Sequence, residues 1–260
     1  WFGLSTAEFI LPVLVTYFFV IYSWRTVWQG IAIVIILFLP FVILSTIKSI
    51  NLGSRELDKN PSLKKIKIKS WKRQDVIKDY RFYIISLNML AMPWMATGVF
   101  VYQSFIAESK FWELYTIPKA FMIYSITSIL TLFLSGFLVD KYSSRKLIPV
   151  MNIPLLISML VLFYSQQEVS AYFFLGLIGI SNGFANVLGS STWAEIYGVK
   201  YIGSIKALTT AFMVFSTAFG TAVFGILIDY GYSVEKIALI CVVYIVASLS
   251  LLLTFKKRLE

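Results

Sequence analysis

Polar side chains are few in the apolar parts of this sequence, and two of them share a regular spacing. Asn182 and Asn186 lie four residues apart within the apolar stretch 170–189, so on a helix they occupy one face. An amide surrounded by hydrocarbon must find a hydrogen-bonding partner or line a cavity that holds water. The pair therefore predicts either the lining of a polar pathway or a bond to a neighbouring helix.

A second group of polar side chains lies in the apolar stretch 82–106. On a helix, Asn88 and Tyr102 fall near one face, and Gln103 follows directly. Pro93 lies between them and removes one backbone hydrogen bond, so a helix here can bend at a defined point. We expect these polar side chains to line a pathway and the bend to permit gating.

Acidic side chains are almost absent from the apolar stretches. Glu8, in the sequence STAEFILP, is the one carboxylate that can lie well inside such a stretch. A carboxylate at that depth is costly unless it is protonated, paired or hydrated. Glu8 is therefore a candidate for proton coupling, and a polar contact to helices outside this chain or an interfacial position are the alternatives.

The residue types that most catalytic and metal sites need are missing. The sequence has no histidine, and its one cysteine, Cys241, lies in the apolar stretch 236–255. It contains no HExxH motif and no pair of aspartates within an apolar stretch, so it offers no catalytic constellation. We expect no enzyme, no metal site and no cofactor.

The elements that must hold these side chains are long and apolar. Of the 260 residues, 58% are hydrophobic and 14% are charged, whereas a soluble domain has about 45–50% and 25%. Crossing the hydrocarbon takes about 20 mostly apolar residues of helix, and no stretch alternates with the period of two of a barrel strand. An all-α integral membrane protein is predicted, with about eight spans: 1–22, 26–47, 82–106, 117–139, 147–165, 170–189, 206–228 and 236–255.

A polar segment divides these spans into two groups. Residues 49–80 are rich in lysine and also contain aspartate, asparagine and proline, so we expect a linker between lobes. It follows the last two spans of an N-terminal lobe (1–48) and precedes a C-terminal six-helix lobe (81–260). Because the sequence starts on Trp1 inside an apolar stretch, we expect it to be a fragment.

The basic residues are distributed unevenly over this topology. If the segment 49–80 is cytoplasmic, 19 of the 23 lysines and arginines fall on the cytoplasmic side, as the positive-inside rule requires, and the C-terminus is cytoplasmic. The excess attracts anionic headgroups, and residues 70–81 predict a short surface helix with Trp71 and Ile77 directed toward lipid. No stacking platform or reading helix is present, so we expect no nucleic-acid partner despite the net charge of +10.

Small residues form stripes on two predicted spans. Gly176, Gly179 and Gly183 follow one another at i, i+3 and i+7, and Gly220 lies four residues after Ser216 in the next span. Such stripes let helix backbones approach closely. They predict tight packing between spans, and the same smooth surfaces would suit helices that slide past one another.

A short turn between two spans, SGFLVDKYSSRKLIP, concentrates four charges. Its spacing of Gly136, Asp140, Lys141, Arg145 and Lys146 resembles the loop signature of the major facilitator superfamily, Gly-x-Leu-x-Asp-Arg-x-Gly-Arg-Arg. It departs from the signature where serines replace the second glycine and one basic residue. The alternative is an ordinary positive-inside loop.

Three further segments resemble one branch of that superfamily, the monocarboxylate-porter and oxalate/formate-antiporter-like branch. They are the turn EIYGVKYIGSIKAL, the span and exit FSTAFGTAVFGILIDYGYS, and the segment VFVYQSFIAE. In the last segment, the resemblance implies that the aromatic–glutamine pair Tyr102 and Gln103 faces the pathway. It also implies a protein of twelve spans, of which this chain covers about spans 5–12.

The resemblance implies a secondary active transporter of a small solute, working by alternating access with proton coupling or exchange. The branch implies a small organic anion, a monocarboxylate or dicarboxylate, as the substrate. Efflux of a drug-like solute is the alternative within the superfamily, and a non-transporting membrane scaffold or sensor is the alternative of another class. We expect no partner other than the substrate, the lipid bilayer and protons. The protein is expected to be a monomer in the plasma (inner) membrane.

The resemblance also implies roles in the charged turn. Gly136 would let its helix approach a neighbour, and Asp140 would accept hydrogen bonds from helix-terminal N–H groups or a nearby arginine. Arg145 and Lys146 would stay at the headgroups. In the full protein Asp140 is expected to meet the helix start at Trp1–Ser5, whose unpaired N–H groups carry partial positive charge. Because only the state closed on the cytoplasmic side brings them together, the turn would act as a conformational switch.

Overall fold

The computed structural model describes residues 2–53 and 71–255, apart from the side chains of 2–5 and 45–53. All regular secondary structure in this part of the chain is α-helical. Seven segments there are long and apolar enough to cross a membrane, and the described part of the first helix adds a shorter apolar one. The helical membrane protein that the composition predicts is confirmed.

The smaller of two compact units, Val13–Lys67, holds the second part of α1 (Phe2–Ile21) and the whole of α2 (Trp24–Gly53). Ser23 caps α2, because its Oγ accepts a hydrogen bond from the backbone N–H of Thr26 at 3.4 Å. The large apolar side chains in the middle of α2 are exposed on all sides. A helix that is apolar all round is suited to lipid or to contact with other spans.

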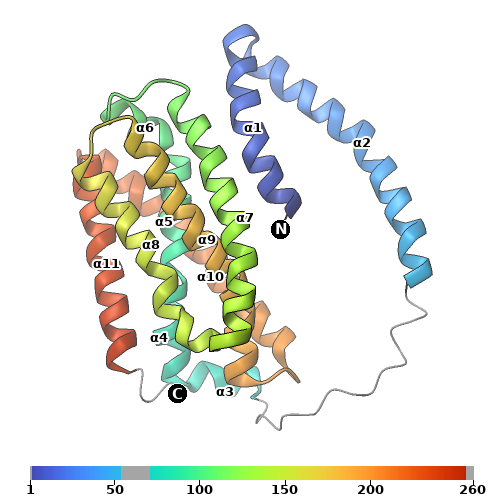
Figure 1. The fold of residues 1–260 in the computed structure, drawn as a ribbon, viewed down its shortest axis with the longest axis vertical. Coiled ribbons are helices and arrows are strands. Elements are labelled where there is room, and N and C mark those ends of the chain that lie inside the picture. The colour runs from blue at the N-terminus through green and yellow to red at the C-terminus, as the bar shows by residue number, and fades with distance from the viewer. Residues whose placement is uncertain (1, 54–70, 256–260) are drawn as a thin grey trace. The chain divides into compact units, whose positions relative to one another are not determined.

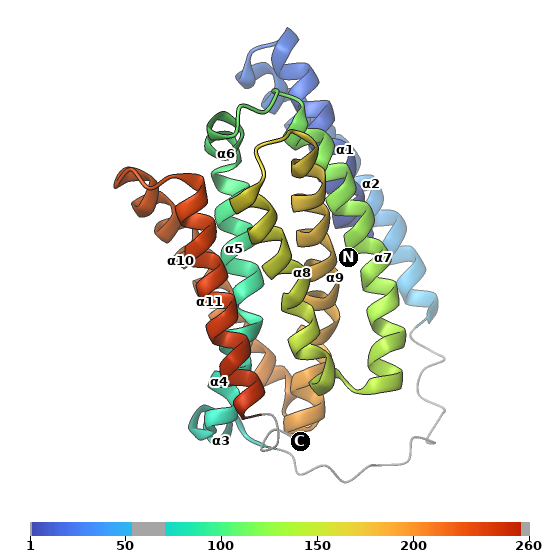
Figure 2. The same ribbon diagram turned by 60° about the vertical axis from the view of Figure 1, so that its left-hand side comes forward.

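The larger unit, Trp1–Pro12 with Ile68–Glu260, contains a body of six spans. Its helices after α1 are α3 (Arg73–Lys78), α4 (Tyr80–Met89), α5 (Ala91–Val101), α6 (Gln103–Ser109), α7 (Thr116–Tyr142), α8 (Ser144–Tyr164), α9 (Val169–Tyr197), α10 (Ile202–Asp229) and α11 (Val234–Thr254). The long helices run side by side, and α8 lies between α9 and α11 (Figures 1 and 2).

Helix α9 packs most extensively against α7, through small residues. A Cβ at Gly183 would lie 2.7 Å from the backbone oxygen of Ser128, and one at Gly179 would collide with the backbone of α7. Thr127 of α7 donates a hydrogen bond to the carbonyl oxygen of Gly176 at 2.9 Å. The glycine stripe therefore lies in the α7–α9 interface, where backbones meet without side chains between them.

The span that follows the linker is three helices rather than one. Its first break is at Leu90, between α4 and α5, and the second is at Tyr102, between α5 and α6. Pro93 has no N–H to donate to the carbonyl of Met89, and its ring crowds that carbonyl. The first break thus agrees with the bend expected from Pro93, whereas the second has no proline beside it.

The last residues of the predicted linker pack on the six-span body. The backbone N–H of Trp71 donates to the carbonyl oxygen of Tyr197 at 3.0 Å, and the two rings meet edge-on at 5.5 Å. The guanidinium of Arg81 lies 5.5 Å from the centre of the Trp71 ring. The expectation that Trp71 faces lipid is therefore wrong, because its ring gains aromatic and cation–π contacts at the end of α9. Ile77 remains exposed.

Candidate functional site

A polar stripe on α9, formed by Asn182, Asn186 and Ser190, is partly exposed. These residues follow one another at intervals of four, so they share one face of the helix. Each is half-buried rather than enclosed. Polar groups at this depth mark positions available to a solute or to spans outside the six-span body.

Asn182 bonds to a neighbouring helix and is also available to line a pathway, the two roles that its spacing left open. Its Nδ2 donates a hydrogen bond to Oγ of Ser128 on α7 at 3.0 Å, so it joins two helices while part of it stays exposed. Asn186, one turn further along, has no hydrogen-bond partner among the described residues. Its amide is therefore the freer of the two to bind a solute.

Tyr102 and Gln103 lie at the second break of the span formed by α4, α5 and α6, which we call the divided span. The ring of Tyr102 is stacked on Phe224, with centroids 6.5 Å apart and 17° between the planes. Its hydroxyl lies against Gly225 of α10, where any side chain would collide with it. Gln103 is partly exposed. Among the described residues no hydrogen bond links this pair to the α9 stripe, so the structure places two separate groups of polar candidates.

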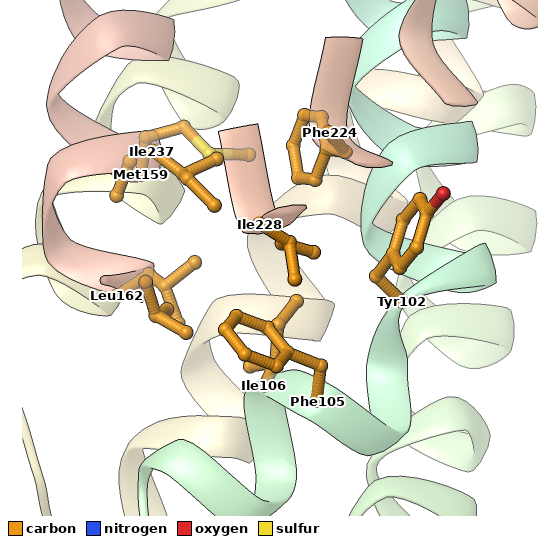
Figure 3. A pocket seen from close by; sticks show the side chains of 10 residues that line it. Tyr102, Phe105, Ile106, Met159, Leu162, Phe224, Ile228 and Ile237 are labelled. Atoms are coloured by element: carbon orange, nitrogen blue, oxygen red, sulfur yellow. The ribbon is translucent and has the colours of Figure 1, made fainter. Parts of the chain in front are cut away.

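A narrow pocket lies beside Tyr102, between α6, α8, α10 and α11 (Figure 3). Phe105, Met159, Phe224 and Ile237 are among the side chains that line it. The Tyr102 ring forms one wall, and its hydroxyl points away from the centre. Because the other lining side chains are apolar, this pocket offers no group that would bind an anion.

Asn88, the remaining candidate of the pathway group, lies inside the six-span body. Its side chain is fully buried, and its backbone oxygen accepts a hydrogen bond from Nδ2 of Asn152 on α8 at 2.8 Å. A solute could not reach an enclosed amide in this conformation. In this conformation Asn88 therefore does not line a pathway open to a solute.

Glu8, on α1, is half-buried, and its Oε2 is enclosed without a hydrogen-bond partner among the described residues. A carboxylate oxygen in this state is stable only if it is protonated or finds a partner elsewhere. Protonation corresponds to the proposed role in proton coupling, and a partner elsewhere corresponds to the alternative, a polar contact to helices outside this chain.

The charged turn contains a single residue between its two helices. Helix α7 ends at Tyr142 and α8 begins at Ser144, with only Ser143 between them in a left-handed conformation (φ 74°). Glu195, near the end of α9, accepts hydrogen bonds from the backbone N–H of Ser144 at 3.0 Å and from the hydroxyls of both serines. Arg145 forms an ion pair with Glu195 at 3.5 Å and donates to its backbone oxygen at 2.7 Å.

Among the described residues, Glu195 makes the contacts of this turn with a helix-terminal N–H and with an arginine. Helix-terminal N–H and arginine both bond to Glu195, whereas Asp140 is exposed and has no ion pair in the part of the chain that the structure describes. The reason is position, because Asp140 lies in the last turn of α7 and Glu195 lies beside the first turn of α8. The expected contact of Asp140 with Trp1–Ser5 falls on side chains outside the described residues.

The other residues of the signature have simple surroundings. Lys141 and Lys146 are exposed, and the ammonium of Lys141 lies 5.2 Å from the centre of the Tyr142 ring. A Cβ at Gly136 would meet no described atom within 4 Å. The close approach expected at Gly136 is therefore not made by the described helices.

Gly220, unlike Gly136, packs closely against the backbone of another helix. A Cβ there would collide with the backbone oxygen of Trp94 on α5. Ser216, one turn earlier on α10, donates a hydrogen bond to the carbonyl oxygen of Leu90 at 3.1 Å. The small face of α10 thus packs directly on the divided span.

Two charged clusters at the helix ends were missed in the sequence. At one end, Asp79 accepts from Arg81 Nε at 2.9 Å and from the hydroxyl of Tyr197 at 3.2 Å. At the other end, the fully buried ammonium of Lys110 lies 2.7 Å from Oε1 of Glu235. Opposite charges at the ends of predicted spans were a visible signal, but their pairing depends on which helices are neighbours. No cluster of metal-binding side chains occurs among the described residues.

In the described part of the chain, six spans of apolar helix, with polar side chains on interior or half-buried faces and ion pairs at the helix ends, define a polytopic helical membrane protein. The family model of the Major Facilitator Superfamily matches residues 2–204 and 85–259. The chain belongs to this superfamily, and it is a secondary transporter that acts on a small-molecule substrate in a lipid bilayer. No curated protein and no solved structure matches the chain.

Proposed function

We propose that the protein transports a small organic anion, a monocarboxylate or dicarboxylate, by alternating access with proton coupling or exchange. The proposal rests on the sequence resemblance to the monocarboxylate-porter and oxalate/formate-antiporter-like branch. The structural observation that supports a solute pathway is the half-exposed α9 stripe, in which Asn186 has no partner among the described residues. Tyr102 and Gln103, at the second break, extend the pathway, and Glu8 supplies a proton-coupling group.

The proposed orientation places the C-terminus and the charged turn in the cytoplasm. It follows from the 19 of 23 basic residues that this topology puts inside. In that orientation Asp140 biases the protein toward the state closed on the cytoplasmic side. The Lys110–Glu235 ion pair then lies at the outer surface.

A second candidate substrate class, uncharged drug-like compounds, is favoured by one observation. Each basic residue of the described part of the body lies in a loop or near a helix end, Lys110 among them. An anion at mid-depth would therefore have only amides and hydroxyls from this body as partners. The countercharge for an anion must come from other spans.

Flux measurements on the full-length protein in proteoliposomes distinguish these candidates. Labelled monocarboxylates and dicarboxylates should accumulate when a proton gradient or an internal exchange substrate is supplied. Accumulation of uncharged compounds alone would favour the second candidate. Absence of flux for both classes would contradict the proposal and favour a scaffold or sensor.

Cysteine labelling tests the pathway itself. Cys241 is the only cysteine of these 260 residues, so Cys241→Ala, with any cysteine in the rest of the full-length protein also replaced, provides a background for single cysteines at positions 102, 103, 182 and 186. A membrane-impermeant thiol reagent should label these positions, and substrate should protect them. Ser181→Cys is the matched control, because Ser181 is fully buried and donates to the backbone oxygen of Met151. Labelling no stronger than at position 181 would assign these residues to packing.

A further inference from the structure

The break between α4 and α5 is surrounded by hydrogen-bond donors from three other helices. In a continuous helix the carbonyl of Met89 would accept from residue 93, but Pro93 has no N–H. Carbonyl groups beside this position accept hydrogen bonds from side chains: Leu87 from Tyr244 of α11 at 2.8 Å, Asn88 from Asn152 of α8 at 2.8 Å, and Leu90 from Ser216 of α10 at 3.1 Å. The carbonyl oxygen of Leu90 also accepts from the backbone N–H of Trp94 at 3.3 Å, so side chains supplement the helix bonds at the break.

Two amide side chains at the same place lack partners of their own. Asn88 and Asn152 are both 0% exposed. Among the described residues, Oδ1 and Nδ2 of Asn88 and Oδ1 of Asn152 have no hydrogen-bond partner. Each buried polar group left in this state costs about 1–3 kcal/mol, and native proteins commonly satisfy such groups with internal water.

The hydrogen-bonding types of the three unsatisfied groups, donor or acceptor, identify the ligand. Two of the three are acceptor oxygens and one is a donor nitrogen. A metal cation would bind the two oxygens and leave the N–H₂ of Asn88 unsatisfied, and an anion would do the reverse. Water donates and accepts, so it can bridge all three. We propose that Asn88 and Asn152 form an internal water-binding site between α4 and α8 at the break of the span.

The site has a mechanical consequence. A water molecule can exchange hydrogen-bond partners in place, whereas a direct bond between side chains is broken when helices move. The angle between α4 and α5 can therefore change without leaving an amide of Asn88 or Asn152 stranded. This inference concerns the interior of the body and does not depend on the identity of the substrate.

Radiolytic footprinting of the full-length protein in lipid nanodiscs tests the proposal. X-ray pulses produce hydroxyl radicals from water, and methionine sulfur close to a bound water is oxidised. Met151, beside Asn152 in the chain, is 1% exposed, and Met95 of α5 is 0% exposed within the large apolar cluster and does not line the pocket beside Tyr102. Met95 follows Asn88 by seven residues, about 10 Å of helix. Met151 should be oxidised several-fold faster than Met95.

Two variants test whether the amides of Asn88 and Asn152 cause the faster oxidation of Met151. Asn88→Leu removes two of the three unsatisfied groups while keeping the Asn152 bond to the carbonyl of residue 88, and it should reduce the excess oxidation of Met151. Asn88→Leu/Asn152→Leu replaces both amides with apolar groups of similar size and should abolish the excess. Equal oxidation of Met151 and Met95 in the wild-type protein would overturn the proposal without any variant. An undiminished excess in Asn88→Leu, or any excess in the double variant, would also overturn it.

Discussion

The ion pair between Lys110 and Glu235 joins the end of α6 to the start of α11, and its two members are unequally exposed. Nζ of Lys110 lies 2.7 Å from Oε1 of Glu235, and the lysine side chain is 0% exposed whereas the glutamate is 31% exposed. Gln166 also donates to Oε1 at 3.1 Å. Removing the glutamate leaves a buried ammonium without its partner, whereas removing the lysine leaves a carboxylate that water and Gln166 can solvate.

The two single substitutions should therefore have unequal costs. Glu235→Ala is expected to lower the free energy of unfolding by about 3–5 kcal/mol, the range for stranding one charge of a buried pair. Lys110→Met keeps the apolar stem and removes the buried charge, so its expected cost is about 0–1 kcal/mol. The double variant Lys110→Met/Glu235→Ala should recover most of the loss caused by Glu235→Ala, because it contains no stranded ammonium.

Thermal unfolding of the full-length protein in detergent measures these differences. At about 2–4 °C per kcal/mol, Glu235→Ala should lower Tm by about 6–20 °C, and Lys110→Met by no more than about 4 °C. The double variant is the internal control, since it lacks the same carboxylate as Glu235→Ala. Equal losses in the two single variants, or no recovery in the double variant, would refute charge stranding as the cause.

Three further predictions concern packing and the charged turn. Gly183→Ala places a Cβ 2.7 Å from the backbone oxygen of Ser128 and should cost about 1–3 kcal/mol of stability through overpacking. Gly189→Ala adds a Cβ that meets nothing within 4 Å, and it should raise stability by about 0.5–1 kcal/mol. The thermal unfolding temperatures of the two variants should therefore shift in opposite directions. Glu195→Ala removes the acceptor at the start of α8 and should cost about 1–3 kcal/mol. Asp140→Asn should change stability by less than about 0.5 kcal/mol while shifting thiol accessibility toward the inward-open state; an unchanged inside-to-outside labelling ratio would reduce the turn to a topological signal.

The spans and their class follow from the sequence alone, because length and hydrophobicity act locally. About 20 apolar residues in a row must cross a bilayer as a helix whatever surrounds them, since each backbone group then bonds within its own segment. The missing donor of Pro93 is equally local, but the break at Leu90 does not follow from it alone, because Pro40 and Pro154 lie inside continuous helices. The spacing of the glycine stripe on α9 likewise indicates a contact face before its partner is known.

Pairings between distant helices were decided only by tertiary structure. The sequence places Asp140 closest to Arg145, yet Glu195 on α9 occupies the acceptor position, because the one-residue turn at Ser143 directs the start of α8 toward the end of α9. Helical phase alone suggested that Asn88 shares a pathway with Tyr102, but packing buries Asn88 completely, and its backbone oxygen accepts a hydrogen bond from Asn152 of α8. Local periodicity fixes a residue's position on its own helix, and only packing determines which helix that face meets.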